Sequence, residues 1–90
     1  MIKWRTAAVN DLTRIRNYIS EFNPNAAQAV IERVLRSVDR LNNFPESGRY
    51  GQAAPTREIV VPGLPYIVVY AISNSDIEII AVFHAAQNRR

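Results

Sequence analysis

One side chain in this sequence is of the type that exchanges a proton near neutral pH. It is His84, the only histidine, and imidazole changes its charge between about pH 5 and 8. His84 follows an apolar run, residues 79–83, that is typical of a β-strand. A side chain of this type is therefore expected where a sheet ends. The structural alternative is that His84 hydrogen-bonds to the backbone or caps the sheet.

Arginine provides nearly all of the positive charge. Lys3 is the only lysine, and guanidinium groups bind carboxylates and phosphates through pairs of hydrogen bonds. The net charge is +3, and this excess lies entirely before Leu41, whereas the rest of the sequence is balanced. A basic N-terminal half fits an acidic protein partner as well as a nucleic acid. Solvated helix faces are the simpler alternative.

The composition argues against a metal site or a cofactor. The sequence has no cysteine and a single histidine, so neither a disulfide framework nor a zinc site is expected. No apolar run approaches the roughly 20 residues that span a bilayer. Residues 1–5 lack the apolar segment of a signal peptide. We therefore expect a cytoplasmic protein with no cofactor and no membrane contact.

The first half predicts a short strand, Ile2 to Arg5, and then two helices. Asn23 followed by Pro24 predicts the start of the second helix, with an N-cap and proline at the first helical position. Two helices joined so closely must be antiparallel neighbours. Each has an apolar stripe at helical spacing. The stripes are Ala8, Leu12, Ile15, Ile19 and Phe22 in the first helix, and Ala27, Val30, Ile31, Val34, Leu35, Val38 and Leu41 in the second.

The second half predicts three strands after a loop over residues 44–51. They cover residues 56–61, 65–70 and 77–84, with turn residues at 62–65 and 73–76. The predicted order is β-α-α-β-β-β. This is an α+β fold with a helical hairpin packed on a small antiparallel sheet, and residues 1–90 form a single domain.

Neither face of the predicted sheet is plainly polar. Strict alternation places Ile79 and Phe83 on one face of the last strand, and Val82 and His84 on the other. Two helices can cover only one face of a sheet. The other face must therefore stay partly exposed or be covered by another polypeptide, and we expect an oligomer or an obligate partner.

Taken together, these features resemble the RelE/ParE superfamily of toxins from type II toxin–antitoxin modules. The likeness spans essentially the whole chain. It rests on Trp4, Ala8-x-x-Asp11-Leu12-x-x-Ile15, Tyr18-Ile19, Asn23-Pro24-x-Ala26-Ala27, Phe44-Pro45-x-x-Gly48-Arg49, Arg57-Glu58, Pro65-Tyr66-Ile67-Val68-Val69-Tyr70 and Val82-Phe83-His84-x-x-Gln87. The resemblance implies a toxin neutralised by an antitoxin with an acidic wrapping segment, in a hetero-oligomer. The residues expected to bind it are Arg14, Arg33, Arg36, Arg40 and Tyr66.

The RelE-like branch of the superfamily cleaves mRNA in the ribosome without a metal, which requires an acid, a base and cations at the phosphate. For this branch the resemblance implies His84 as acid or base and Arg57 or Arg49 as the phosphate clamp. It also implies Tyr66 or Tyr70 as a stacking or orienting group, and Glu46 or Glu58 as a second carboxylate. One departure is Ile67, which stands where that branch commonly carries a catalytic arginine.

Structural alternatives exist for the same residues. Arg57 could pair across strands with Glu78. Tyr66 and Tyr70 could be aromatic residues of the core or of its margin. The role of Arg49 could be limited to shaping the loop after the helices.

The ParE-like branch inhibits DNA gyrase and catalyses no reaction of its own. The neutral sheet half and Ile67 favour this reading, and Gln87, Arg89 and Arg90 are then the expected target-binding residues. A third reading is a non-toxic protein that acts only as a co-repressor with its antitoxin. We favour the ParE-like reading, with the RelE-like ribonuclease and the co-repressor as alternatives.

Overall fold

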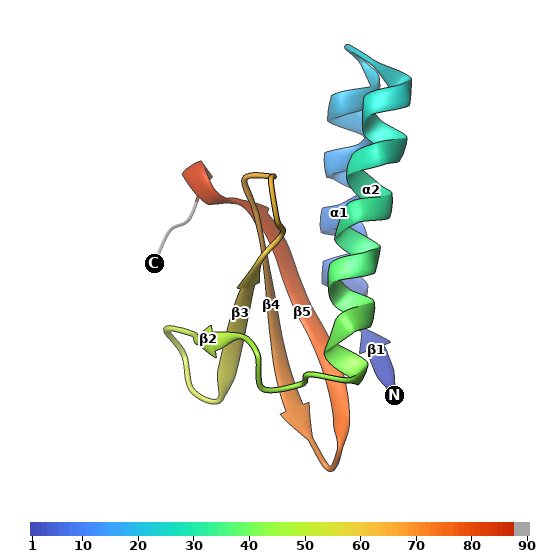
Figure 1. Cartoon of the computed structure of the whole chain (residues 1–90). Helices are drawn as coiled ribbons and strands as arrows, with labels where there is room; N and C mark the ends of the chain where they lie inside the picture. The colour runs from blue at the N-terminus through green and yellow to red at the C-terminus, as the bar shows by residue number, and fades with distance from the viewer. Residues whose placement is uncertain (88–90) are drawn as a thin grey trace.

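Two antiparallel helices cover one face of a five-stranded sheet (Figure 1). The computed structural model describes residues 1–87. Its elements are β1 (Ile2–Trp4), α1 (Thr6–Ser20), α2 (Pro24–Asp39), the 3₁₀ turn η1 (Arg40–Asn42), β2 (Arg49–Tyr50), β3 (Thr56–Val60), β4 (Tyr66–Ser73), β5 (Asp76–His84) and the 3₁₀ turn η2 (Ala85–Gln87). The α+β class and the helical hairpin are confirmed.

The sheet is mixed, whereas the sequence predicted antiparallel pairing alone. The strand order is β1-β5-β4-β3-β2, and β1 runs parallel to β5. The other neighbours are antiparallel. The strand β2 lies inside the predicted loop, because two residues are too few to show a period in sequence. Pairing of Arg49 with Glu58 and of Tyr50 with Arg57 defines it instead.

The helices begin and end close to the predicted positions. The Asn23 side-chain oxygen accepts a hydrogen bond of 3.1 Å from the Ala26 N–H, and Pro24 is the first residue of α2. The expectation that Phe22 belongs to the buried stripe was wrong. Because α1 ends at Ser20, Phe22 lies in the turn, 73% exposed, with its ring edge-to-face against Tyr18.

A β-bulge in β5 overturns the predicted assignment of faces. Val69 pairs with Ala81 but Tyr70 pairs with Ile79, so Ile80 is an extra residue and the alternation shifts by one. Val82 therefore joins Ile79 in the core under the helices. His84 pairs with Tyr66 and lies on the same face.

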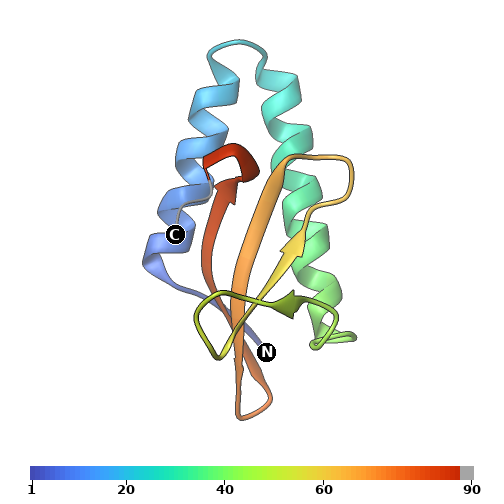
Figure 2. The same ribbon diagram turned by 90° about the vertical axis from the view of Figure 1, so that its left-hand side faces the viewer.

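The opposite face of the sheet carries no α-helix from residues 1–87. In Figure 2 this face is turned to the viewer, with both helices behind it. Val69, Ala81 and Phe83 on this face are half-buried, and Ile67 is buried. The end of the described chain, η2, turns toward the same side (Figure 1).

Ion pairs fasten β1 to the end of the β4–β5 hairpin. The N-terminal ammonium group and Lys3 each lie 3.4 Å from the Asp76 carboxylate. Hydrogen bonds from the ammonium group and from Lys3 lower the pKa of Asp76. Within residues 1–87, neither helix is long and apolar enough to cross a membrane.

We expect Ile79→Ala to lower the free energy of unfolding by about 2–5 kcal/mol, because it leaves a cavity at the fully buried centre of the core. Urea denaturation followed by circular dichroism measures the change. The exposed Val9 provides the control, and Val9→Ala should change stability by less than about 0.5 kcal/mol. Equal losses in the two variants would contradict the placement of Ile79.

Candidate functional site

Tyr70 is a fully buried anchor for the loop that precedes β2. Its hydroxyl donates a hydrogen bond of 2.7 Å to the Pro45 carbonyl and accepts one of 3.0 Å from the Gly48 N–H. A Cβ on Gly48 would lie 2.6 Å from that hydroxyl and 2.8 Å from the Glu58 carbonyl oxygen. Only glycine therefore fits at position 48. Because the Tyr70 hydroxyl donates its proton to the Pro45 carbonyl, it has none left to donate to a ligand.

Arg57, the cross-strand partner of Tyr70, holds the same loop through further hydrogen bonds. Its Nη1 donates to the carbonyls of Glu46 and Gly48, at 3.2 and 2.9 Å. Its guanidinium carbon lies 4.4 Å from the centre of the Tyr50 ring, a cation–π contact. The alternative that Arg57 pairs with Glu78 does not hold, because Glu78 binds Arg5 at 3.0 Å.

Arg49 is committed to a cross-strand ion pair. Its Nε and Nη2 lie 3.3 and 3.1 Å from one oxygen of Glu58, whose side chain is largely buried. The pair joins β2 to β3 on the face away from the helices. Arg49, Arg57 and Tyr70 thus form a cluster along β2, β3 and β4, in which Arg49 lies on the opposite face from the other two. Arg49 binds Glu58, and Arg57 and Tyr70 bind the loop before β2.

His84 lies at the far end of β4 from this cluster. It pairs with Tyr66, whereas Arg57 pairs with Tyr70, four residues along β4. At 3.3 Å per strand residue the separation is about 13 Å. The four residues predicted as catalytic are therefore not brought together. Glu46 and Glu58 lie with the Arg57 cluster and not with His84.

The His84 ring has two neighbours that fix its orientation. Its Nδ1 accepts a hydrogen bond of 3.0 Å from the Ala86 N–H. Since Nδ1 accepts, the neutral ring carries its proton on Nε2. Tyr66 packs edge-to-face against it, with ring centres 5.4 Å apart. The bond runs from the backbone of η2 to the ring, so His84 joins the end of β5 to the turn that follows.

A cleft of about 790 Å³ opens beside His84, between α1 and the end of β5. Arg14, Tyr18 and Tyr66 line it as well. Burial, with a smaller contribution from Tyr18, raises the pKa of the Tyr66 hydroxyl above its usual value. Tyr66 therefore stays a neutral hydrogen-bonding group in this cleft at neutral pH.

Asp11 belongs to this site, although the sequence analysis named it only within the motif Ala8-x-x-Asp11-Leu12 and gave it no role. One carboxylate oxygen accepts a hydrogen bond of 3.0 Å from the Val82 N–H, and the other binds Arg14. The contact caps the edge of β5 beyond its pairing with β1. The sequence did contain a signal for this contact, because Asp11 lies next to the apolar stripe of α1. A carboxylate that packs beside a buried stripe needs a hydrogen-bond donor nearby.

The residues predicted to bind an antitoxin lie in two places. Arg14 and Tyr66 share the cleft beside His84. Arg33 and Arg36 are exposed on α2, and Arg40 is exposed at the start of η1. Of the predicted target-binding residues, Gln87 ends η2, and Arg89 and Arg90 lie outside the described residues. Within residues 1–87, no three His, Asp or Glu side chains come together in a way that could hold a metal ion.

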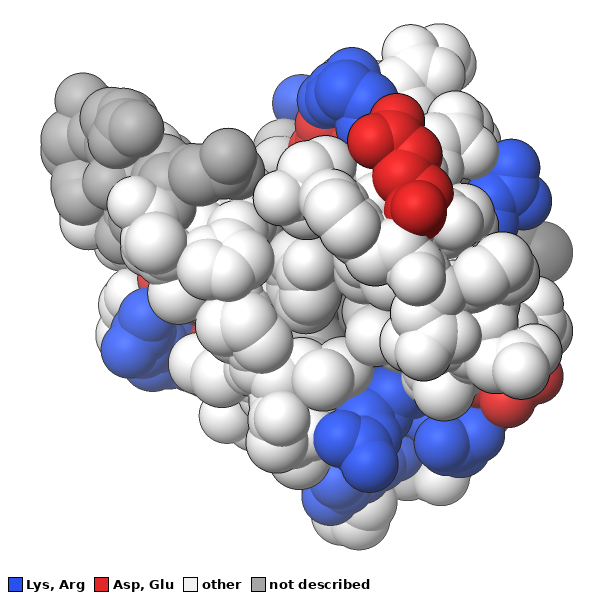
Figure 3. Space-filling model, turned by 90° about the horizontal axis from the view of Figure 1, so that it is seen from above, with Lys and Arg blue, Asp and Glu red and all other residues white. Residues whose placement is uncertain are grey.

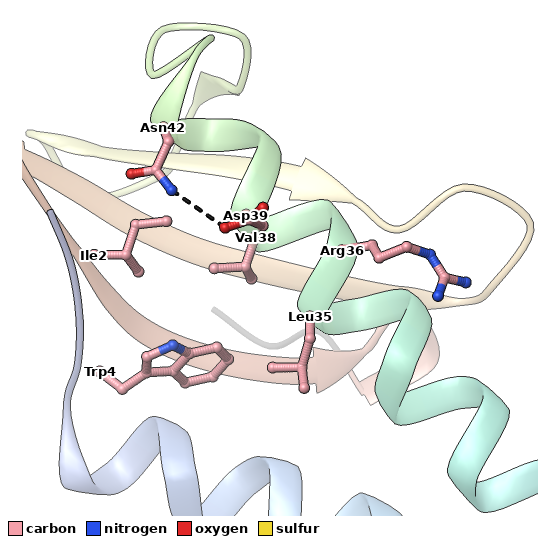
Figure 4. A pocket seen from close by; sticks show the side chains of 7 residues that line it. All are labelled: Ile2, Trp4, Leu35, Arg36, Val38, Asp39 and Asn42. Carbon is pink, nitrogen blue, oxygen red and sulfur yellow. Dashed lines mark hydrogen bonds between the residues drawn. The ribbon is translucent and has the colours of Figure 1, made fainter.

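A shallower groove of about 440 Å³ lies between β1 and the C-terminal half of α2 (Figure 4). Trp4 and Leu35 line it, and Asn42 donates to the Asp39 carboxylate at 3.2 Å. Arg36 points away from Trp4 in this view (Figure 4). The groove has no group suited to acid–base chemistry beyond the hydrogen-bonded Asp39.

Comparison with known proteins gives consistent matches over nearly the whole chain. A family model described as the ParE toxin of the type II toxin–antitoxin system parDE matches residues 2–89. The putative toxin Y4kP of Sinorhizobium fredii (strain NBRC 101917 / NGR234) is 43% identical over 86 residues, which are 96% of this chain and 88% of that protein. Toxin RelE2 of Caulobacter vibrioides (strain ATCC 19089 / CIP 103742 / CB 15) is 37% identical over 86 residues, 96% of each.

Two solved structures share the fold. A chain of the chromosomal ParDE system from P. aeruginosa superposes with a TM-score of 0.82 at 20% identity, over 92% of each chain. The isolated E. coli RelE toxin superposes with a TM-score of 0.71 at 14% identity, over 100% of this chain and 86% of that one. At these identities the two structures support the fold alone.

We expect Tyr70→Phe to destabilise the protein by about 1–3 kcal/mol, because it removes one partner from the buried Gly48 N–H and one from the Pro45 carbonyl. Urea denaturation measures the loss. Tyr18 is exposed, and Tyr18→Phe is the matched control, with an expected change below about 0.5 kcal/mol. If Tyr70→Phe were as stable as the unmodified protein, Tyr70 would not anchor the loop before β2.

We expect His84→Ala to speed hydrogen exchange of the Ala86 amide about fivefold, the equivalent of one hydrogen bond of about 1 kcal/mol. His84→Asn should keep the slow exchange, because its side-chain oxygen can accept the same bond. Amide exchange followed by NMR tests both variants. The same exchange rate in His84→Ala and in the unmodified protein would show that the bond does not hold η2.

Proposed function

Because the chain belongs to the ParE toxin family of type II toxin–antitoxin systems, we propose that it arrests growth by binding DNA gyrase and is neutralised by a cognate antitoxin. The chain is the toxin component of such a module. Gyrase as the target is the part of this proposal that goes beyond family membership. It follows the ParE-like interpretation of the sequence.

The dispersal of the candidate catalytic groups carries this proposal. Metal-independent RNA cleavage requires an acid, a base and a cation within hydrogen-bond reach of a single phosphodiester. Here His84 lies about 13 Å along β4 from Tyr70 and Arg57. Arg49 is bound to Glu58, and the Tyr70 hydroxyl is bound inside the loop. Inhibition by binding needs no such constellation.

Ile67 adds support. It stands where the RelE-like branch commonly has a catalytic arginine, and it is buried on the face of the sheet away from the helices. A guanidinium group is therefore missing where a phosphate clamp would be expected. The same face presents Phe83, Val69 and Ala81, which suit contact with a protein more than with an RNA backbone.

The loop held by Arg57 offers further protein-binding groups. Tyr50 is 79% exposed and Phe44 is 58% exposed. The cation–π contact holds the Tyr50 ring against Arg57. Exposed aromatic rings that are fixed in place lose little conformational entropy on binding and often dominate interface energetics.

We expect the purified chain to inhibit gyrase supercoiling of relaxed plasmid and to accumulate cleaved gyrase–DNA complexes, while mRNA on translating ribosomes stays intact. Replacing both Arg89 and Arg90 with alanine should weaken inhibition at least tenfold, since these charges are expected to contact the target. The control is Arg16→Ala, an exposed arginine on α1.

Other outcomes separate the alternatives. Cut mRNA with unaffected gyrase would replace the proposal with the RelE-like reading. Normal growth of bacteria that express the chain alone would leave only the co-repressor role. If the Arg89/Arg90 variant and the Arg16 variant inhibited gyrase equally, Arg89 and Arg90 would not contact the target. Gyrase would still be the target.

A further inference from the structure

The cleft beside His84 is a surface to which the proposed function gives no role. Its volume of about 790 Å³ lies within the range of clefts that bind ligands or the side chains of a partner. Ile15, Val82 and Phe83 supply its apolar lining. The charged and aromatic groups at its margin then decide what it can bind.

One carboxylate of this cleft has no partner of its own. Asp11 and Arg14 bind each other, and the second Asp11 oxygen accepts a hydrogen bond from the Val82 N–H. Glu21 also lines the cleft and has no ion pair among residues 1–87. Its negative charge is therefore available to a cation. Seen from above, acidic side chains border an uncharged central surface, and basic side chains lie around its margin (Figure 3).

An exposed aromatic ring lies close to this carboxylate. Tyr18 precedes Glu21 by three residues at the end of α1, so the two side chains share one side of the helix. Tyr18 is 63% exposed, and Phe22 packs edge-to-face against its ring, with ring centres 5.3 Å apart. The face of a tyrosine ring attracts cations, and a planar guanidinium group can stack on it. The neutral Tyr66 hydroxyl adds a hydrogen-bond acceptor to the same cleft.

We propose that the cleft beside His84 binds an arginine side chain of a partner protein. The guanidinium group pairs with Glu21, stacks on Tyr18 and donates a hydrogen bond to the Tyr66 hydroxyl. Apolar residues next to that arginine contact the exposed Phe22 ring. The inference goes beyond the proposed function, and it does not depend on gyrase being the target.

Charge and shape select this occupant over the alternatives. An acidic segment, such as the one expected in an antitoxin, would be repelled by Glu21, and so would the phosphates of a nucleic acid. A lysine would pair with Glu21, but its ammonium group is a point charge and lacks the planar face that stacks on Tyr18. Phe22 is 73% exposed, so the contact continues over apolar surface beyond the arginine. A protein segment uses both features, whereas a small cation uses only the first.

The test is an NMR titration of the full chain with the peptide acetyl-Leu-Arg-Leu-amide. We expect the backbone amide signals of Tyr18, Val82 and Ala86 to shift, because these residues line the cleft. The same peptide with citrulline in place of arginine keeps the shape of the side chain and loses its charge. It should bind about fivefold more weakly, since the ion pair with Glu21 is lost.

Two variants each remove one of the attractions. Glu21→Gln and Tyr18→Ala should each weaken binding of the arginine peptide about threefold, as expected for a surface ion pair and an exposed cation–π contact. Glu32→Gln on α2 and Val9→Ala on α1 change exposed residues outside the cleft and should leave the affinity unchanged. Glu21→Gln should also reduce the preference for arginine over citrulline, which a loss of folding would not do.

Equal affinities for the arginine and citrulline peptides would overturn the proposal, as would equal affinities of Glu21→Gln and Glu32→Gln for the arginine peptide. Signals that shift only outside the cleft would overturn it too. Tighter binding of acetyl-Leu-Glu-Leu-amide would instead assign the cleft to an anion, held by Arg14 and His84. Gyrase is absent from this titration, so the proposed target and the arginine site can fail independently.

Discussion

A single extra residue in β5 decides how the functional surfaces are arranged. Tyr70 pairs with Ile79 and Val69 with Ala81, so Ile80 has no partner of its own. The shift lets the helices cover Ile79 and Val82 together, and it brings His84 to the helix side of the sheet. Without it, Val82 and His84 would face the side that no α-helix of residues 1–87 covers. The cleft beside α1 and the Asp11 bond to the Val82 N–H both follow from this bulge.

The loop before β2 explains why residues typical of catalysis serve the fold here. The carbonyls of Pro45, Glu46 and Gly48 need donors where the loop packs against the sheet. Tyr70 and Arg57 supply these donors from the central part of the sheet. An arginine and a tyrosine on adjacent strands would look like a phosphate site in sequence. Their partners, which only the tertiary structure reveals, are backbone carbonyls.

The elements that could be predicted from the sequence are those that depend on the spacing of apolar residues and on local turn residues. The helix start at Asn23 and the three long strands follow from such local patterns, and the structure has them. The sequence could not predict β2, which exists only through its pairing with β3, or the bulge at Ile80, since an inserted residue leaves the apolar character of β5 unchanged. The separation of His84 from Arg57 depends on strand register, which alternation alone does not fix.

The distribution of ion pairs shows which part of the surface is complete without a partner. At the edges of the sheet, Arg5 binds Glu78 and Arg49 binds Glu58, so these charges are neutralised within the chain. Arg33 and Arg36 on α2 and Arg40 at the start of η1 have no carboxylate within ion-pair distance among the described residues. An acidic partner would pair with these charges. Because exposed charges act over about 10 Å at moderate salt, they would also speed the encounter with such a partner.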